Sequence, residues 1–132
     1  MILVDSNILM YAAGEKHPNR EPSIAWLEKV AREEIDGVLD AEVLQEILHR
    51  YRAIRRWDDG RKVYDLARTI LPLVIPVDCA VMDRARELMD RYRPLVARDA
   101  VHAAVVLVHN LQGICSYDDD FDLVEGLNRI EP

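Results

Sequence analysis

Four acidic side chains lie within or beside apolar segments of this chain, and their types suit metal-dependent hydrolysis. Asp5 follows an apolar run in MILVDSNILM, Glu46 lies within VLQEIL, Asp99 precedes AVHAAVVLV, and Asp118 follows GICSY. Taken singly, each has an ordinary explanation: a helix cap, an ion pair with an arginine one turn later, or an acidic surface turn. Three of them lie at strand or helix ends that are predicted to line one crevice, and Glu46 lies near the start of a helix, and this coincidence indicates a shared site.

The chemistry of such a site follows from its charge. Carboxylates gathered in one cleft repel one another, so they either raise each other's pKa or bind a hard cation. Oxygen ligands without His or Cys favour Mg²⁺ or Mn²⁺, and the four histidines show no zinc-type spacing. One or two such ions, about 4 Å apart if paired, activate a water and stabilise a leaving oxyanion. The sequence therefore predicts phosphodiester hydrolysis, provided that the fold brings the carboxylates together.

The elements that must position these residues alternate along the chain. Short apolar runs predict strands, and longer segments of helical period predict helices. We expect strands over 2–5, 37–39, 73–77, 113–116 and 128–131, and helices over 7–13, 21–34, 41–55, 59–70, 80–92 and 99–110, with a short turn at 121–125. This order predicts an α/β fold with a central, mostly parallel sheet of about five strands flanked by helices on both faces. Ligands bind beyond the carboxyl ends of such strands, where Asp5 and Asp118 are expected.

The segment that follows Asp99 is predicted to be the central helix. It is apolar nearly all round over 100–111, which is typical of a buried helix. A carboxylate that enters a buried helix is poorly hydrated, and a buried charge is costly without a partner. We interpret His102, one turn later, as a hydrogen-bonded packing residue rather than as a metal ligand.

Composition narrows the class of protein. The 132 residues, half of them hydrophobic, predict a single domain over 1–132 without a membrane span or a secretion signal. Cys79 and Cys115 lie far apart and outside any metal-binding pattern, which indicates reduced thiols in a cytoplasmic protein. A net charge of −7 argues against an indiscriminate nucleic-acid coat, although all but three of the 17 basic residues are Arg, which suits phosphate contacts.

The four segments VDSNIL, VLQEIL, ARDAVHAA and SYDDDF, in this order, resemble the PIN-domain ribonucleases. Within that family the chain is most similar to the VapC toxins of prokaryotic VapBC toxin–antitoxin pairs, and the resemblance covers nearly the whole chain. It implies a PIN-like fold and Mg²⁺- or Mn²⁺-dependent endoribonuclease cleavage of RNA that leaves a 5′-phosphate. It also implies a homodimer and a neutralising antitoxin partner.

The resemblance also implies roles for individual residues. Asp5, Glu46, Asp99 and Asp118 match the family's four acidic positions, although Asp119 or Asp120 can share the last role. Asp5, Asp99 and Asp118 are expected to hold the metal directly or through its waters. Glu46 is expected to orient or deprotonate the attacking water, or to bind a second ion.

Supporting residues follow from the same comparison. Ser116 stands where the family often has Thr or Ser at the last strand end, and Asn7 and Asp120 are expected to assist. Asp40 departs from the family, in which Ser or Thr more often precedes the second helix. Since Asp also caps helices, the expected fold is unaffected.

The sequence does not decide the role of two sets of residues. Arg52, Arg55 and Arg56, on the polar side of the helix predicted over 41–55, either guide the RNA backbone or form a solvated face. The large apolar residues within 21–70 either form a dimer interface or belong to the core; they are Trp26, Leu27, Val30, Tyr51 and Trp57.

Other functions fit the sequence less well. A catalytically weak or inactive PIN module would bind RNA or a protein through the same fold, and retention of all four acidic positions argues against it. A phosphatase of the haloacid dehalogenase type needs a second Asp two residues after Asp5, where this chain has Asn7. A response-regulator receiver needs a suitably placed lysine, and none of the three lysines ends a predicted strand.

Overall fold

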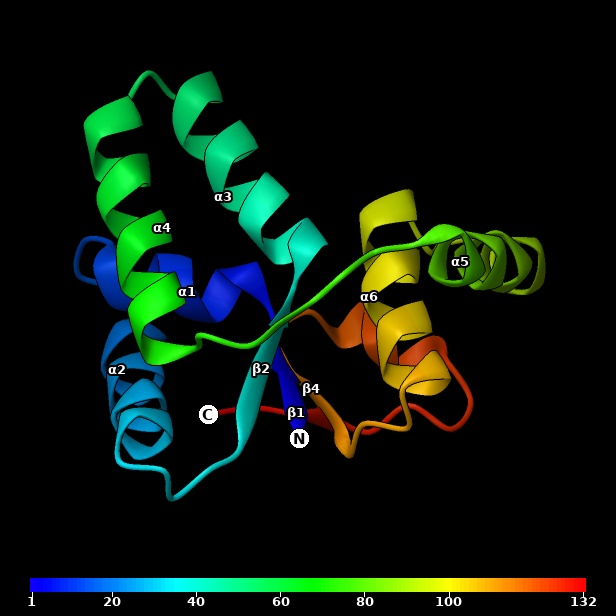
Figure 1. The fold of residues 1–132 in the computed structure, drawn as a ribbon. Coiled ribbons are helices and arrows are strands. Elements are labelled where there is room, and N and C mark those ends of the chain that lie inside the picture. The colour runs from blue at the N-terminus through cyan, green and yellow to red at the C-terminus, as the bar shows by residue number, and fades with distance from the viewer.

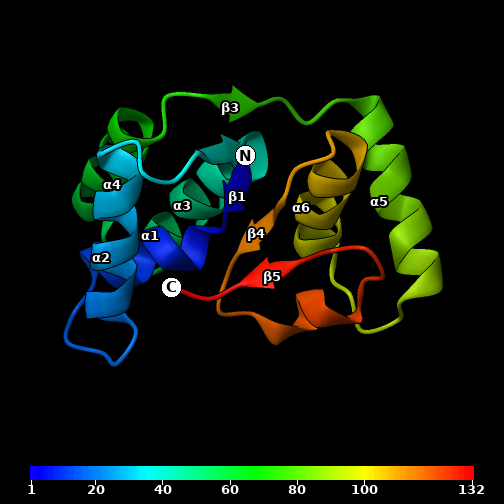
Figure 2. The same ribbon diagram turned by 90° about the horizontal axis from the view of Figure 1, so that it is seen from below.

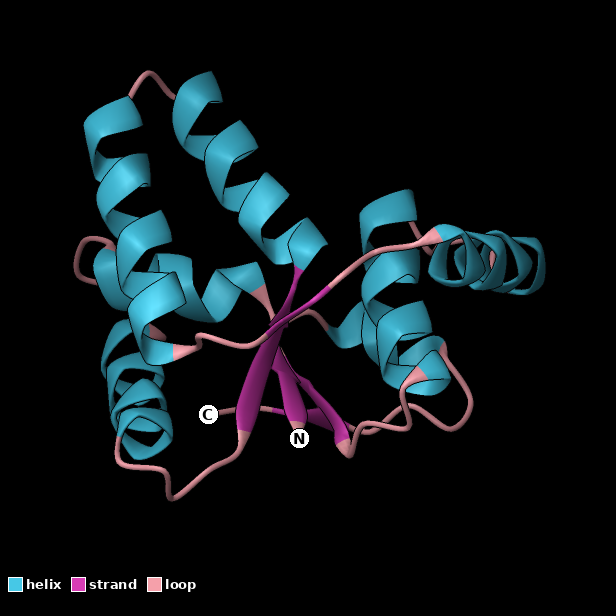
Figure 3. Cartoon of the chain, viewed as in Figure 1, coloured by secondary structure: helices cyan, strands magenta, loops and turns pink.

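A computed structural model describes all 132 residues and has a five-stranded sheet at its centre (Figures 1 and 3). The strands are β1 (Ile2–Val4), β2 (Gly37–Asp40), β3 (Val74–Ile75), β4 (Gly113–Cys115) and β5 (Arg129–Ile130). They pair in the order β3-β2-β1-β4-β5, and every pairing is parallel, with Leu3 opposite Val38 on one side and Ile114 on the other. The predicted α/β sheet is confirmed.

Helices cover both faces of this sheet. They are α1 (Ser6–Ala13), α2 (Arg20–Ala31), α3 (Ala41–Ala53), α4 (Trp57–Ile70), α5 (Cys79–Arg91), α6 (Ala97–Val108) and the short 3₁₀ helix η1 (Asp119–Leu123). Figure 2 shows α1 to α4 on one side of the strands and α5 with α6 on the other. Each side has its own hydrophobic cluster, of 15 and 16 buried residues respectively. The helix that follows Asp99 is buried along most of its length, as its apolar sequence predicts.

Aspartate side chains cap two of the α-helices. Asp40 accepts a hydrogen bond from the backbone N–H of Val43 at the start of α3 (2.9 Å), and Asp78 accepts one from Val81 at the start of α5 (3.0 Å). Asp5 precedes α1 with extended backbone angles but makes no side-chain cap bond. The cap interpretation of Asp5 is therefore wrong, and its carboxylate is free for other partners.

Several boundaries differ from those predicted. The helix predicted over 21–34 ends at Ala31, close to Glu33 at a φ of 60°, and the one predicted over 41–55 ends at Ala53, close to Arg55 at a φ of 59°. Positive φ is incompatible with a continuing right-handed helix, so the chain turns at both places. The strand predicted over 73–77 is only the pair Val74–Ile75.

The large apolar residues proposed for a dimer interface are mostly core. Trp26, Leu27, Val30 and Tyr51 are all buried within the cluster beneath α1 to α4. Trp57 is half-buried, with the guanidinium of Arg52 over its ring at 4.5 Å. The four buried residues are therefore unsuited to an intermolecular surface. No helix has both the length and the apolar character needed to cross a membrane.

Candidate active site

The carboxyl ends of the three central strands bring three polar residues to one edge of the sheet. Asp5 follows β1, Asp40 ends β2, and Ser116 follows β4. The backbone N–H of Asp5 donates to the carbonyl oxygen of Cys115 (3.0 Å), which sets Asp5 beside Ser116. This is the crevice in which parallel sheets bind their ligands.

Asp5 is nearly inaccessible to solvent and is held by hydroxyl groups. Its Oδ2 accepts a hydrogen bond from Ser116 Oγ (2.5 Å), and its Oδ1 lies 3.3 Å from Ser6 Oγ. Burial raises the pKa of Asp5, and the nearby His102 and the Ser116 hydroxyl oppose that rise. A carboxylate in this position gains from a bound cation because water solvates it poorly.

A second acidic group lies where η1 begins. Oxygens of Asp99, Asp118 and Asp120 all lie within 4.8 Å of one another. Burial, followed by the charges of Asp118 and Asp5, raises the pKa of Asp99 to about 7. Asp119, by contrast, is exposed and lies outside this group. The structure thus brings two aspartates of the run, rather than one, towards Asp99.

The turn that carries Asp118 is fixed to Ser116. The Ser116 hydroxyl accepts a hydrogen bond from the backbone N–H of Asp118 (3.0 Å), and Asp118 Oδ1 accepts one from the N–H of Asp120 (2.9 Å). Ser116 also accepts from Asn7 Nδ2 (3.1 Å), while Asn7 Oδ1 is buried without any partner. A buried acceptor without a donor is uncommon, and a hydrated cation beside it would supply one. The all-oxygen donor set fits Mg²⁺ or Mn²⁺.

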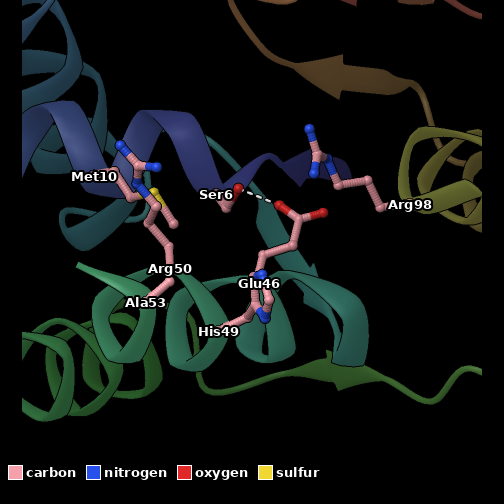
Figure 4. Close-up of a pocket in the computed structure, with 7 residues that line it drawn as sticks. All are labelled: Ser6, Met10, Glu46, His49, Arg50, Ala53 and Arg98. Carbon is pink, nitrogen blue, oxygen red and sulfur yellow. Dashed lines mark hydrogen bonds between the residues drawn. The ribbon is translucent and has the colours of Figure 1, made fainter. Parts of the chain in front are cut away.

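Glu46 reaches the same crevice from α3, and its carboxylate is held at both oxygens. Oε1 lies 2.7 Å from Nε2 of His102, and Oε2 accepts a hydrogen bond from the Ser6 hydroxyl, as Figure 4 shows. The ion pair with Arg50 suggested by their spacing does not form. A buried hydroxyl and an imidazole outcompete an exposed arginine because surface ion pairs contribute little.

His102 lies at the centre of this arrangement and is fully buried. Its Nδ1 is 2.7 Å from Oδ2 of Asp40, and its Nε2 is 4.0 Å from Oδ1 of Asp5. Burial alone would lower the pKa of His102, but Asp40 and the hydrogen bond with Glu46 raise it well above its ordinary value. His102 is hydrogen-bonded, as interpreted from sequence, but its partners were missed. The only sequence signal was a histidine inside an otherwise apolar helix.

A pocket of about 350 Å³ opens beside Glu46, and it contains two arginines that sequence reasoning did not select (Figure 4). Arg50 comes from α3 and Arg98 from the first turn of α6, and neither forms an ion pair within the protein. The remaining lining residues are Ser6, Met10, His49 and Ala53. Two unpaired guanidinium groups next to an acidic site suit a polyanionic ligand.

The three arginines proposed for RNA binding lie elsewhere. Arg52 stacks on a tryptophan ring, Arg56 pairs with Asp59 (2.8 Å), and Arg55 occupies the turn after α3. Arg52 lies in the last turn of α3, and Arg55 and Arg56 lie in the connection to α4, which Figure 1 shows at the far end of α3 from the strands. They are therefore not gathered with the four acidic residues.

The fold and site can be compared with known proteins. A family model described as "PIN domain" matches residues 2–127. A VapC ribonuclease of Mycobacterium bovis is 40% identical over 130 residues, which are 98% of this chain and 99% of that protein.

Two solved structures share the fold. One is the Mycobacterium tuberculosis toxin VapC20, described as cleaving the sarcin–ricin loop, with a TM-score of 0.81 at 17% identity over the full length of both chains. The other is VapBC2 from Rickettsia felis bound to a promoter DNA fragment. It has a TM-score of 0.79 at 18% identity and covers 99% of this chain and 98% of that one.

Proposed function

This chain belongs to the PIN-domain family, and we propose that it is a metal-dependent endoribonuclease that hydrolyses RNA phosphodiester bonds. The observation that carries the proposal is the convergence of Asp5, Glu46, Asp99 and Asp118 on one crevice at the carboxyl ends of the strands. We further propose that residues 1–132 form one PIN domain and that the protein acts in the cytoplasm as the toxin of a VapBC-type pair. An antitoxin partner is part of this proposal and is supported by the similarity to VapC relatives and to the solved VapBC complex. A homodimeric state is also part of the proposal.

The roles of the residues follow from their positions. We assign Asp5, Asp99 and Asp118 as the residues that would hold Mg²⁺ or Mn²⁺. Asp120 lies in one group with Asp99 and Asp118, and the charge of Asp5, which belongs to a neighbouring group with Glu46 and His102, acts on Asp99. When bound, the ion would activate a water and stabilise the leaving oxygen of the RNA. We assign to Glu46 the role of orienting that water or accepting its proton; the contacts of its two oxygens with His102 and Ser6, which fix its orientation, support this role. Ser116 holds Asp5 and the Asp118 turn together.

Removal of the metal tests this proposal. Purified protein is incubated with total cellular RNA, and new RNA ends are mapped and counted over time. With Mg²⁺ or Mn²⁺ we expect cleavage at defined positions, and with EDTA we expect none; restoration of Mn²⁺ should restore cleavage. A protein that binds Mn²⁺ saturably but cleaves no RNA would instead be an inactive PIN module. Cleavage that persists in EDTA would contradict the metal mechanism.

The pocket arginines are expected to bind the RNA backbone. Replacing Arg50 and Arg98 together by Gln should weaken RNA binding about tenfold and reduce the slope of log K against log salt by roughly 0.7 per lost phosphate contact. Binding is measured by fluorescence anisotropy with a labelled single-stranded RNA, in an Asp99→Asn background that prevents cleavage. The matched control replaces Arg52 and Arg55 by Gln and should leave both quantities nearly unchanged. Equal effects of the two pairs would indicate attraction by overall charge alone.

A further inference from the structure

His102 connects two carboxylates that belong to different parts of the chain. Its Nδ1 meets Asp40 and its Nε2 meets Glu46, both at 2.7 Å, although these partners are 62 and 56 residues away in sequence. Asp40 and His102 have no exposed surface. The three side chains therefore form one continuous buried chain that leads from the end of β2 to the edge of the crevice.

The Asp40 side chain contacts His102 in addition to capping α3. Its Oδ1 accepts the N–H of Val43, which is the capping bond, and its Oδ2 faces the imidazole of His102. A Ser or Thr cap has a single side-chain oxygen and is shorter, so it would cap α3 without also holding the ring. The carboxylate thus has a second task that a cap does not require.

The ring in turn restricts Glu46. A glutamate side chain has several rotamers, and fixing such a side chain costs conformational entropy. Here one carboxylate oxygen faces the buried imidazole and the other faces the Ser6 hydroxyl, so the plane of the carboxylate is set before any substrate arrives. Preorganised groups of this kind contribute to catalysis because the protein need not reorganise during the reaction.

We propose that His102, anchored by Asp40, is a positioning residue that holds the Glu46 carboxylate in the orientation required for RNA hydrolysis. His102 does not touch the RNA, and it acts only through Glu46. This inference rests on the proposed nuclease function. The arrangement has the logic of a carboxylate that orients an imidazole in a catalytic triad, with a carboxylate in place of the nucleophile.

Two substitutions at His102 separate positioning from structural support. In His102→Asn the amide lies near the place of Nδ1, so the contact with Asp40 is retained and the one with Glu46 is lost. In His102→Gln the amide lies near the place of Nε2, so the contact with Glu46 is retained and Oδ2 of the buried Asp40 loses its partner. A buried carboxylate oxygen without a hydrogen-bond donor is destabilising, so His102→Gln should have the lower Tm of the two.

Activity is expected to follow the opposite order. His102→Asn should lower kcat by about 10- to 100-fold, the range found for groups that orient the ligands of a metal site. His102→Gln should stay closer to the wild-type kcat, and KM should change little in either variant because His102 does not contact RNA. If kcat and Tm fall together, with His102→Gln the worse in both, the residue is purely structural and the proposal is wrong.

The side chain of Asp40 provides a second test with a matched control. Asp40→Ser keeps a helix cap but removes the contact with His102, whereas Asp78→Ser makes the same change at the cap of α5. We expect cleavage to slow about tenfold in the first variant and to stay unchanged in the second. Equal rates for both variants would contradict the proposal.

Two further measurements do not depend on cleavage. Mn²⁺ titration by calorimetry should give the same number of sites in wild type and His102→Asn, and a lost site would make His102 a metal ligand and overturn the proposal. In ¹⁵N NMR spectra the His102 ring should show slowly exchanging N–H signals, and Asp40→Ser should remove the Nδ1–H signal while Asp78→Ser retains it. A wild-type protein that cleaves no RNA contradicts the proposed function. In that case the ring signals alone decide the positioning claim, and their absence in wild type overturns it.

Discussion

Replacing Asp99 by Asn is expected to abolish RNA cleavage while the protein stays folded. Asp99 shares a group with Asp118 and Asp120 whose oxygens lie within 4.8 Å of one another. The amide is neutral and cannot replace a charged ligand of a divalent ion, whose charge stabilisation contributes several kcal/mol to the transition state. Since each 1.4 kcal/mol changes a rate tenfold, we expect a loss of about 10³-fold or more.

The measurement is the rate at which new RNA ends appear in total cellular RNA, together with growth arrest when the gene is expressed. Asp119→Asn is the matched control because it makes the same change in the same acidic run at an exposed position outside the group. That variant should keep nearly full activity. Unchanged cleavage by a purified Asp99→Asn protein would refute the assignment of the site.

The same substitution should stabilise the metal-free protein. Burial and the charges of Asp118 and Asp5 raise the pKa of Asp99 from 3.8 to about 7, so the ionised form disfavours the folded state. This penalty is absent below pH 3.8, grows as the pH rises between these two values, and is complete above pH 7. In EDTA, the Tm of Asp99→Asn should therefore exceed that of wild type at pH 8, and the difference should shrink on acidification. A lower Tm at pH 8 would indicate that Asp99 has mainly a structural role.

Replacing Phe121 by Ala is expected to have the largest effect on stability. Phe121 is the only phenylalanine in the chain and is fully buried within η1, immediately after the acidic turn. Its ring packs in the hydrophobic cluster beneath α5 and α6, with its centroid 6.5 Å from that of His102. Truncation of a buried phenylalanine typically costs about 3–5 kcal/mol, a large share of the roughly 5–15 kcal/mol that stabilise a domain.

Urea denaturation measures this loss, and the midpoint should fall by about 2 M for a slope near 2 kcal/mol/M. Leu123→Ala is the control because Leu123 lies in the same short helix but is 46% exposed. It should lower the free energy of unfolding by less than about 1 kcal/mol. Similar losses in both variants would show that Phe121 is not the anchor of this turn.

The positions of the strands and helices were predicted well from the sequence. Short apolar runs and a period of 3.6 residues are local properties of the chain, and so they located every strand and helix to within a few residues. The parallel sheet followed from the alternation of these elements. Boundaries were less certain because helix ends depend on single turns, such as the positive φ of Glu33 and Arg55.

For the candidate site, too, the sequence predicted some features and missed others. Sequence alone placed Asp5, Asp99 and Asp118 near one edge, because parallel strands end on the same side of a sheet. It did not reveal the partners of Glu46, for which a local pair with Arg50 was the natural expectation. Nor did it select the pocket arginines Arg50 and Arg98, because they come from different helices and meet only in the folded protein.

The sequence by itself thus determined the elements, their order and the edge at which acidic residues collect. Only the tertiary structure decided which polar groups meet there: His102 with Asp40 and Glu46, and Ser116 with Asp5 across 111 residues. The physical reason is that such contacts depend on how α6 packs against the strand ends. That packing depends on how two hydrophobic clusters fit together over the whole chain, so it cannot be predicted from a local sequence pattern.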